Sequence, residues 1–389
     1  MKKIRVLFPF VEAGFGHIMP TRSISETFQK KYGDRVEVIP CHFFTETGDK
    51  HMIRYEQTLA RQVRIYNRFP LIGHTATFFC AVFGSTLASV GSMVVIGPVA
   101  CKRSVEHMRE LDCDVVFSTH WATNYYAEHL KKKPFTVMYC PDARLNKLFE
   151  YHADLNMISM PYGYLKALRK KQYTVNNMKL VPFLIRNEAF AVSPDKQAAR
   201  KRLGIPEDNF TVLLAEGGYG IGKMTEICKR LAGEHIPLTL IPVCGKNEKL
   251  FRQLSSLPTS EEVTLLPYGF ADNMFELEAA ADIFCGKSGN MLAEATFFGN
   301  PSVVTNCSNS IEHNIADHYI NTVGCSIKQL SAKKTARMIK DCINDPALLD
   351  PYRKAALRYH EHFGSEQAAD ELWEAILRQF PELKDTITQ

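Results

Sequence analysis

The 389-residue chain lacks the features of a disulfide-linked, zinc-binding or nucleic-acid-binding protein. Its 11 cysteines are an odd number and include no C-x-x-C pair, which disfavours both a disulfide framework and a zinc site. A net charge of only +5 gives no general attraction to nucleic acid, so we expect no such partner. Reduced thiols in the cytosol are the simplest account of the cysteines.

The N-terminus and the overall composition do not indicate a secreted or low-complexity protein. MKKIRVLFPF has neither the apolar core nor the small-residue cleavage site of a signal peptide. The hydrophobic fraction of 46% and the charged fraction of 23% are those of an ordinary globular protein. A length of 389 residues therefore predicts about two domains, each large enough for its own core.

Apolar runs alternate with helical periodicity along most of the chain. Continuous apolar runs are typical of parallel strands that helices cover on both faces. Strands alternating with helices predict the α/β class, with two Rossmann-like, doubly wound domains that face each other across a cleft. The expected strands are Ile4–Phe8, Val36–Pro40, Val115–Ser118, Thr136–Tyr139, Leu155–Ile158, Thr211–Ala215, Leu238–Val243, Val263–Leu266, Ile283–Cys285 and Ser302–Thr305.

A polar stretch that contains two prolines, at 186–209, separates two halves that each begin with a strand. We therefore expect an N-terminal domain over 1–187 and a second domain over 205–365. The C-terminal segment 366–389 begins with an amphipathic pattern, which predicts a helix that packs back across the domain junction.

The 33 residues from Phe69 to Cys101 contain no Asp, Glu, Lys or Arg. Length alone would allow a transmembrane helix. Several glycines and two prolines interrupt the segment, and it lies within a domain whose strands must pair on both sides of it. Three interpretations stay open: a membrane-spanning helix, a buried pair of core helices, and shallow insertion into a membrane, which is favoured.

The stretch that precedes this segment, 49–69, has the pattern of an amphipathic helix. A basic, aromatic-containing amphipathic helix beside an apolar stretch is typical of an interfacial anchor on anionic lipid. We therefore expect Arg61, Arg64 and Arg68 to contact an anionic membrane surface; a surface helix with a solvated face is the alternative. The apolar face comprises Met52, Tyr55, Leu59, Val63 and Tyr66.

The stretch VEAGFGHIMP follows the first expected strand directly. Gly14 and Gly16 permit a tight turn and the close approach of a ligand. His17 stands before the next helix and can take a proton from a hydroxyl group, since an unperturbed histidine has a pKa near 6.5. A histidine that merely caps the turn is the alternative. The stretch is not the dinucleotide fingerprint, because Met19 stands where the third glycine is needed.

Glycine-rich turns also follow strands of the second half. LLAEGGYGIGKM contains Gly217 and Gly218, which can wrap a phosphate or a sugar, and Gly245 follows the next expected strand. Ligands of doubly wound sheets bind at such carboxyl ends of strands. Further along, Gly269-Phe270 can place backbone groups against a base; an ordinary core role for Phe270 is the alternative.

The segment Pro267–Asn314 is the most informative part of the chain. A strand is followed by the turn Ser288–Asn290, which opens a helix. The first turn of a helix presents N–H groups and the positive end of its dipole, which suits a diphosphate. Glu294 lies about one helical turn further on and can hold a ribose hydroxyl. Glu312, in a loop after the next strand, can accept hydrogen bonds from sugar hydroxyls; a solvated surface glutamate is the alternative.

These motifs together resemble those of the GT-B-fold nucleotide-sugar glycosyltransferases that make glycosyl-diacylglycerols, a family that includes monogalactosyldiacylglycerol synthase and the bacterial diacylglycerol glucosyltransferases. GFGHIMP looks like the first glycine loop of the family, DCDVVFSTH like its DVVISTHP strand, and LVPFLIRNEAF like its GIPIRPxF link. VCGKNEKL and GFADNMFELEAAADIFCGKSGNMLAEATFFGNP are the most similar stretches.

The resemblance implies an inverting hexosyltransferase that moves a sugar from a UDP-sugar to a lipid hydroxyl such as that of diacylglycerol. It implies no cofactor and no catalytic metal ion, because helix N–H groups can stabilise the departing UDP. His17 would be the general base. The nucleotide sugar would be bound by Gly14, Gly16, Gly217, Gly218, Gly245, Phe270, Ser288, Gly289, Asn290, Glu294 and Glu312.

Within that site, the resemblance places Phe270 near the base, the turn 288–290 at the diphosphate, Glu294 at the ribose and Glu312 at the sugar. The domain over 1–187 would be the acceptor and membrane side. The enzyme would be cytoplasmic and peripheral, on the inner face of the cell membrane, with a UDP-sugar, a lipid acceptor and the anionic membrane surface as partners.

Departures from the family pattern leave the sugar and the acceptor open. The family often has Pro-Gly and Thr in place of residues 288–291, a Gln before the glutamate where Ile311 stands, and a histidine shortly after the position of Asp142. The alternatives are a glycosyltransferase for a polyprenyl-linked or small-molecule acceptor, a UDP-sugar 2-epimerase, and an inactive membrane-binding homologue.

Overall fold

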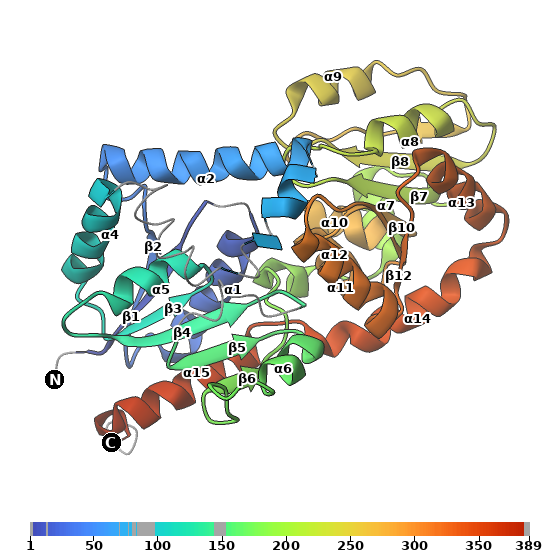
Figure 1. Ribbon diagram of the computed structural model, residues 1–389. Coiled ribbons are helices and arrows are strands. Elements are labelled where there is room, and N and C mark those ends of the chain that lie inside the picture. The colour runs from blue at the N-terminus through green and yellow to red at the C-terminus, as the bar shows by residue number, and fades with distance from the viewer. Residues whose placement is uncertain are drawn as a thin grey trace. The chain divides into compact units, whose positions relative to one another are not determined.

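The computed structural model describes residues 3–12, 15–69, 71–76, 78–79, 83, 98–143 and 153–384 (Figure 1). Its internal contacts divide the chain into two units, and each is described by itself. The first unit comprises Met1–Asn187, Asn309–Ile311 and His362–Gln389, and the second comprises Glu188–Ser308 and Glu312–Glu361. Compared with the limits expected from the sequence, this division assigns residues 188–204 to the second unit and the C-terminal segment to the first.

The first unit contains a six-stranded parallel sheet in the order β2-β1-β3-β4-β5-β6. Because β2 and β3 lie on opposite sides of β1, the strand order reverses between β1 and β3, which makes this place a topological switch point. The strands are β1 (Arg5–Phe10), β2 (Glu37–His42), β3 (Val115–Ser118), β4 (Phe135–Cys140), β5 (Leu155–Ile158) and β6 (Met178–Leu180).

Helices cover both faces of this sheet, because alternate residues of a strand point to opposite sides. Val6 and Phe8 of β1 lie in a buried cluster with residues of α1 (Phe15–Tyr32) and α15 (Glu366–Gln379). Leu7, between them, lies in a second cluster with residues from three other helices. These are α2 (Lys50–Arg68), α4 (Pro98–Glu110) and α5 (Trp121–Glu128), and α6 (Pro161–Ala167) follows β5.

The C-terminal helix α15 packs against α1 within the first unit. Trp373 stacks on Tyr32 with 4.6 Å between ring centroids, and the Tyr32 hydroxyl donates to Asp370 Oδ1 at 2.5 Å. The amphipathic pattern thus correctly predicted a helix here. The expectation that this segment packs across the domain junction stays a prediction.

The second unit contains another six-stranded parallel sheet, in the order β12-β11-β10-β7-β8-β9. Read from the β9 edge, this is the 3-2-1-4-5-6 order of nucleotide-binding sheets, with the switch point between β7 and β10. The strands are β7 (Phe210–Ala215), β8 (Leu238–Val243), β9 (Val263–Leu265), β10 (Ile283–Lys287), β11 (Ser302–Asn306) and β12 (Ser326–Lys328).

The helices of the second unit follow its strands in regular alternation (Figure 1). One buried cluster joins Val212 and Leu214 of β7 to side chains of three of these helices, α8, α9 and α13. The helices are α7 (Lys196–Leu203), α8 (Met224–Leu231), α9 (Glu248–Ser255), α10 (Met274–Ala280), α11 (Asn290–Phe297), α12 (Ser310–Asp317), α13 (Ala332–Asn344) and α14 (Asp350–Tyr359).

All ten strands expected from the sequence are confirmed, with ends shifted by up to two residues. Two further strands, β6 and β12, were not predicted. Each has three residues and forms one edge of a sheet. Their short sequences, MKL and SIK, contain no continuous apolar run, so their pairing depends on the neighbouring strand rather than on a local pattern.

Candidate functional site

In the first unit, the predicted base His17 lies at the switch point between β1 and β3. It follows β1 and occupies the first turn of α1, whereas the sequence analysis placed it before the helix. Gly16 is likewise a helical residue rather than part of a turn, and that expectation is corrected. A Cβ on Gly16 would meet no atom within 4 Å. Gly14 lies outside the described residues.

The imidazole of His17 is oriented by the loop that follows β3. Its Nδ1 lies 2.7 Å from Thr119 O, and a carbonyl oxygen can only accept, so Nδ1 carries the proton and the ring lone pair is on Nε2. The hydroxyls of Thr21 and Thr119 both donate to His17 O, at 2.8 and 3.0 Å. The ring therefore has the tautomer that a general base needs.

His120 lies against His17 with perpendicular rings and 4.9 Å between centroids. Its Nδ1 accepts the Ala122 N–H at 3.3 Å, which caps α5 and places the His120 proton on Nε2. Burial lowers the pKa of His17, although the Thr119 carbonyl opposes this shift. Burial, and then the charge of His17, lower the pKa of His120 well below its usual value. Both rings are therefore neutral at physiological pH. Neither Thr119 nor His120 was predicted from the sequence.

In the second unit, the predicted nucleotide site lies at the carboxyl ends of the strands on both sides of the β7/β10 switch point. The glycine-rich stretch after β7 begins with Gly217, which has a φ of +74°, a conformation that glycine adopts without cost. The stretch after β10 holds the turn Ser288–Asn290. Doubly wound sheets bind their ligands at this crevice.

Backbone hydrogen bonds join the loops that follow β7, β8 and β9. The Gly245 N–H donates to Gly269 O at 3.1 Å, and the Lys246 N–H donates to Gly218 O at 2.8 Å. A Cβ on Gly245 would collide with the Gly218 carbonyl, and the φ of Gly245 is +60°, so only glycine fits. The structure thus brings the predicted residues Gly218 and Gly245 into direct contact.

Asn306, at the end of β11, connects these loops to the turn after β10. Its side-chain amide donates to Ile221 O at 3.1 Å, and its carbonyl accepts the Ser288 N–H at 3.2 Å. Asn306 was not predicted, and its only local signal is a polar residue at the end of an apolar strand. We call the connected segments the carboxyl rim; they are residues 217–222, 244–247, 268–270, 288–290 and 306.

The helix expected after the turn Ser288–Asn290 is α11, which begins at Asn290 with Gly289 as its N-cap. Gly289 has φ +149° and ψ −154°, a backbone conformation that is essentially restricted to glycine. A Cβ there would meet no atom within 4 Å, so the space in front of this helix end is open among the described residues. Ser288 is buried, and its Oγ has no hydrogen-bond partner among those residues.

The two predicted carboxylates lie on neighbouring helices. Glu294 is buried on α11, one turn inside the helix. Glu312 lies in the first turn of α12 and not in a loop, which corrects the expectation from the sequence. Its Oε2 accepts the Ser308 N–H at 2.6 Å, and its Oε1 pairs with Lys287 Nζ at 2.7 Å. Lys287, at the end of β10, was not predicted.

Phe270 is 55% exposed at the end of the loop that follows β9. The alternative that Phe270 is an ordinary core residue is therefore wrong. An exposed aromatic ring on the carboxyl rim is of a type that can stack on a base.

Comparisons with known proteins show what the chain and its fold are similar to. No family model matches the chain. It is 24% identical over 375 residues to the probable monogalactosyldiacylglycerol synthase of Nicotiana tabacum, a match that covers 86% of this chain and 64% of the tobacco protein. It is 23% identical over 187 residues to the processive diacylglycerol beta-glucosyltransferase of Bacillus pumilus, a match that covers 48% of each protein. The chain is thus similar in sequence, at low identity, to glycosyltransferases that make glycosyl-diacylglycerols.

The chain spans less than two thirds of the length of the plant relative. The fold is shared more widely: a Staphylococcus aureus MnaA–UDP structure superposes with a TM-score of 0.63 at 14% identity, covering 98% of this chain and 97% of that chain. At that identity the likeness shows the fold alone. Together with the two parallel sheets, it places the chain in the GT-B fold class.

The glycine-rich loop after β7 is fixed by hydrogen bonds to a buried carboxylate. Glu216, at the end of β7, accepts the N–H groups of Lys223 and Met224 at 2.6 and 3.2 Å and the Thr305 hydroxyl at 2.9 Å. Burial raises the pKa of Glu216, and these hydrogen bonds oppose the shift. A Cβ on Gly222 would collide with the Glu216 carboxylate, so the loop closes around this side chain.

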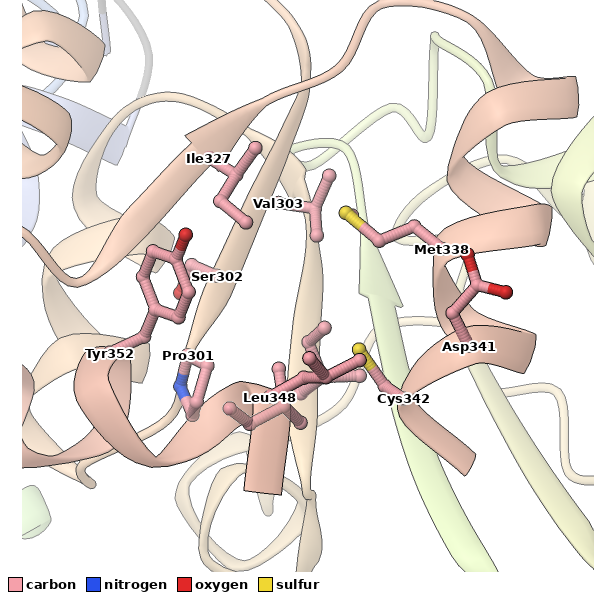
Figure 2. A pocket seen from close by; sticks show the side chains of 11 residues that line it. Pro301, Ser302, Val303, Ile327, Met338, Asp341, Cys342, Leu348 and Tyr352 are labelled. Atoms are coloured by element: carbon pink, nitrogen blue, oxygen red, sulfur yellow. The ribbon is translucent and has the colours of Figure 1, made fainter. Parts of the chain in front are cut away.

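A cavity of about 230 Å³ lies elsewhere in the second unit, between the sheet and the helices α13 and α14 (Figure 2). Its lining includes Ile283 and Ser302, the first residues of β10 and β11, so it lies at the amino ends of these strands. No predicted site residue lines it. Its volume is below the roughly 300–1,000 Å³ of typical ligand sites.

Within the part of the chain that the structure describes, no group of three or more His, Cys, Asp or Glu side chains is placed to hold a metal ion. The ten cysteines that it describes are all free.

The helix expected before the apolar segment is α2, and its amphipathic pattern is confirmed. Met52 and Tyr55, on its apolar face, are buried in the core of the first unit, whereas Arg61 and Arg64 are exposed. The side chain of Arg68 lies outside the described residues. No helix within those residues is long and apolar enough to cross a membrane.

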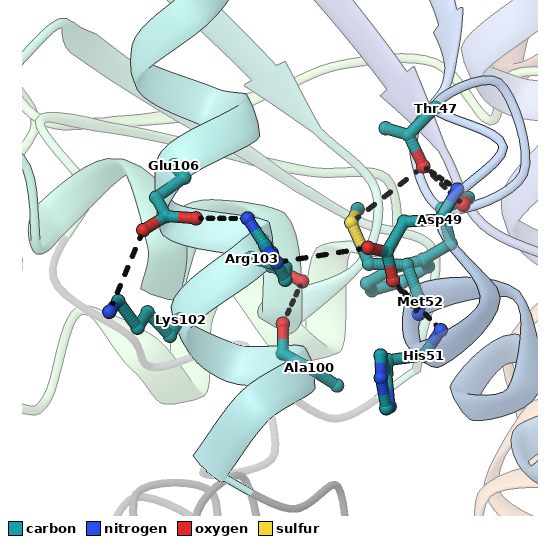
Figure 3. A network of polar contacts seen from close by, with 10 residues as sticks. Thr47, Asp49, His51, Met52, Ala100, Lys102, Arg103 and Glu106 are labelled. Carbon is teal, nitrogen blue, oxygen red and sulfur yellow. Dashed lines mark hydrogen bonds and ion pairs between the residues drawn. The ribbon is translucent and has the colours of Figure 1, made fainter.

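Polar contacts fix the start of α2 to α4, the helix that follows the apolar segment (Figure 3). Asp49 caps α2 by accepting the N–H groups of His51 and Met52 at 2.8 and 3.1 Å, and its other oxygen lies 3.8 Å from Arg103 Nε. Arg103 also pairs with Glu106 at 3.2 Å. The apolar segment therefore lies between two helices that are anchored on one unit.

Most of the segment Phe69–Cys101 lies outside the described residues. Several apolar side chains in the part that is described are exposed; they are Phe69, Leu71, Ile72, Phe78, Phe79, Phe83 and Val99. The alternative of a fully buried core pair of helices does not fit the exposure of these side chains.

Proposed function

We propose that the chain transfers a hexose from a UDP-sugar to the hydroxyl group of diacylglycerol at a membrane surface, with inversion at the sugar carbon. The observation that carries the proposal is the carboxyl rim, in which glycine-rich loops and the glycine-capped start of α11 surround the β7/β10 switch point. Helix N–H groups and glycine backbone at such a crevice suit a nucleotide diphosphate.

The donor would be held by groups of the second unit. Phe270 stacks on the base, Glu294 accepts a ribose hydroxyl, and the turn Ser288–Asn290 donates to the diphosphate. Glu312 contacts the sugar. No cofactor takes part, and the positive end of α11 stabilises the diphosphate as it leaves.

The first unit would supply the base. The oxygen of the acceptor hydroxyl attacks C1 of the hexose, and its proton passes to Nε2 of His17. The bond between C1 and the β-phosphate oxygen breaks, and its electron pair leaves with UDP. A single displacement of this kind inverts the configuration at C1. The hydrogen bond from His17 Nδ1 to Thr119 O supports this role because it leaves the ring lone pair on Nε2.

The enzyme would bind the membrane peripherally, on the cytoplasmic face. Leu71, Phe78 and Phe79 are 78%, 59% and 54% exposed, and a group of exposed apolar side chains beside a basic helix suits the interface of an anionic bilayer. The relatives named for glycosyl-diacylglycerol synthesis favour diacylglycerol as the acceptor.

A lipid-product assay tests this function. The purified full chain is incubated in detergent with diacylglycerol, one UDP-sugar at a time and EDTA, and the lipid extract is analysed by mass spectrometry. We expect a glycosyl-diacylglycerol with at least one donor, together with an equal amount of UDP. Tight UDP binding without turnover would contradict the transferase proposal and favour an inactive homologue. Donor epimerisation without a lipid product would favour an epimerase.

A further inference from the structure

Lys287 is placed at the point where β10 meets the carboxyl rim. It is the last residue of the strand, directly before the turn Ser288–Asn290. The pairing of β10 with β11 shifts register between Gly286 and Lys287, so that Lys287 lies opposite Asn306. Such irregularities turn side chains in new directions and are common beside functional sites.

The ammonium group of Lys287 forms an ion pair that is largely shielded from water. Its Nζ lies 2.7 Å from Glu312 Oε1, and the two side chains are only 14% and 13% exposed. Glu312 is itself fixed, because its other oxygen accepts the Ser308 N–H at 2.6 Å. Desolvation of both charges offsets much of their attraction, so such a pair is weak evidence for a role in stability.

Unsatisfied polar groups beside this pair point to an anion. The Ser288 Oγ and the Ser308 Oγ are buried and have no hydrogen-bond partner among the described residues. Ser288 directly follows Lys287, and Ser308 is held by the carboxylate that pairs with Lys287. Buried hydroxyls without partners are costly, and a phosphate oxygen would satisfy a donor of this kind.

We propose that Lys287 binds the β-phosphate of UDP and supplies the positive charge that balances the departing diphosphate, while Glu312 holds its ammonium in position. This inference rests on the proposed function and adds a charged residue to the neutral amides of α11. An ammonium carries a full positive charge and up to three N–H donors, so Lys287 can contact Glu312 and a phosphate oxygen at the same time. As the bond from C1 to the β-phosphate oxygen breaks, the charge that accumulates on UDP strengthens its interaction with Lys287.

Nucleotide binding by the full chain, measured by calorimetry in EDTA, tests this role without an acceptor or a sugar. UMP lacks the β-phosphate, so the ratio of UDP to UMP affinity isolates the contacts made by that group. We expect Lys287→Met to weaken UDP binding by roughly 10- to 100-fold, the scale of a lost hydrogen bond to a charged group, and to leave UMP binding unchanged. Lys287→Arg should retain most of the UDP affinity.

Glu312→Gln provides a second measurement, in which we expect UDP affinity to change in the direction opposite to that of Lys287→Met. The amide oxygen still accepts from Lys287, but the negative charge near the phosphate is removed. We therefore expect UDP binding to tighten by about 2- to 5-fold, with UMP unchanged. If Glu312→Gln instead weakens UDP and UMP equally, the pair has only a structural role and the inference is overturned.

Lys196→Met is the matched control, because it removes an ion pair at the opposite end of the same strand. Lys196 Nζ lies 2.6 Å from Asp282, the residue before β10. This variant should lower the melting temperature and leave the UDP-to-UMP ratio unchanged.

The outcomes separate this inference from the proposed function. Absence of UDP binding by the wild-type chain would contradict the proposed function itself. A wild-type chain that prefers UDP to UMP, with the same preference in Lys287→Met, would overturn only the role of Lys287. If Lys287→Met does not fold, the sign of the Glu312→Gln effect and the retention of affinity in Lys287→Arg decide the question.

Discussion

The orientation of His17 depends on a backbone carbonyl and not on a carboxylate. Thr119 O fixes the tautomer by accepting from Nδ1, but it carries no full charge that would stabilise the protonated ring. Burial therefore has the larger effect, and the pKa of His17 is lowered from its usual value. The lowered pKa makes His17 a weaker base, but it also keeps the ring unprotonated over a wider range of pH.

This shift predicts the pH dependence of transfer. The base acts when neutral, so kcat/KM should decrease only as the pH falls below about 6.5, the ordinary histidine pKa, and stay level from there to neutral pH. The same residue stabilises the fold above about pH 6.5 and loses that contribution as the pH falls, because the unfolded chain binds the proton more readily. Steady-state rates with a saturating donor at several pH values check this.

The His17→Gln variant tests whether titration of His17 causes the decrease of kcat/KM at low pH, which we call the acid limb. Transfer should fall by roughly 100-fold or more, the limb should disappear, and UDP affinity should stay unchanged. A variant that loses activity but keeps the acid limb would show that another group titrates. Equal losses of transfer and UDP binding would contradict the role of His17 as a base.

Residue type and spacing were sufficient to single out His17 and the turn Ser288–Asn290 as candidates, because each follows an apolar strand and has a glycine beside it. Lys287 and Asn306 could not be predicted in this way. Their contacts are with residues 25 and 85 positions away, at Glu312 and Ile221, and only the sheet brings them together. The roles of the predicted residues remain predictions until nucleotide binding is measured.

At the scale of elements, patterns with a local physical cause predicted the fold well. Eight of the ten expected strands are largely buried, and they include β1 and β7, which border the switch points of the two sheets. The edge strands β6 and β12 were missed because each has only three residues and its sequence, MKL or SIK, contains no continuous apolar run. The start of α1 was placed too late, because a glycine beside His17 suggested a turn where the helix has already begun.

In the glycine-rich loop after β7, glycine can be required by the space around it as well as by its backbone conformation. Gly222 has an ordinary φ, so alanine would fit its backbone, but the Cβ would collide with the Glu216 carboxylate. We expect Gly222→Ala to lower the free energy of unfolding by roughly 1–3 kcal/mol, the cost of overpacking. Urea denaturation measures this change.

A double-mutant cycle with Glu216→Ala tests the cause. Glu216→Ala should itself cost about 1–3 kcal/mol, because the N–H groups of Lys223 and Met224 lose their acceptor. In that background the carboxylate is absent, so Gly222→Ala should cost at least about 1 kcal/mol less. Gly233→Ala, at an exposed site of the same unit with no atom within 4 Å of a Cβ, is the control and should change stability little. Strict additivity would show that the collision does not limit the loop.

At the scale of the whole molecule, we expect membrane binding to depend more on where the positive charges lie than on the net charge. A net charge of +5 on 389 residues is small, and the sequence alone could not decide between a solvated helix and a membrane anchor. The structure shows that Met52 and Tyr55 of α2 face the core, which leaves the exposed apolar side chains beyond Ile65 as the surface available to lipid. Membrane binding is thus expected to depend on the C-terminal half of α2 and the segment after it.

Neutralising Arg61, Arg64 and Arg68 together to Gln should weaken binding to vesicles that contain anionic lipid, by about 1 kcal/mol for each charge near the surface. The difference from wild type should shrink as the salt concentration rises, because salt screens exposed charges. Vesicle co-sedimentation at two salt concentrations measures both effects. Neutralising Arg230, Arg252 and Arg378 is the control, since these exposed arginines lie on other helices and change the net charge equally. If both triple variants lose binding to the same extent, total charge drives the association and α2 is not an anchor.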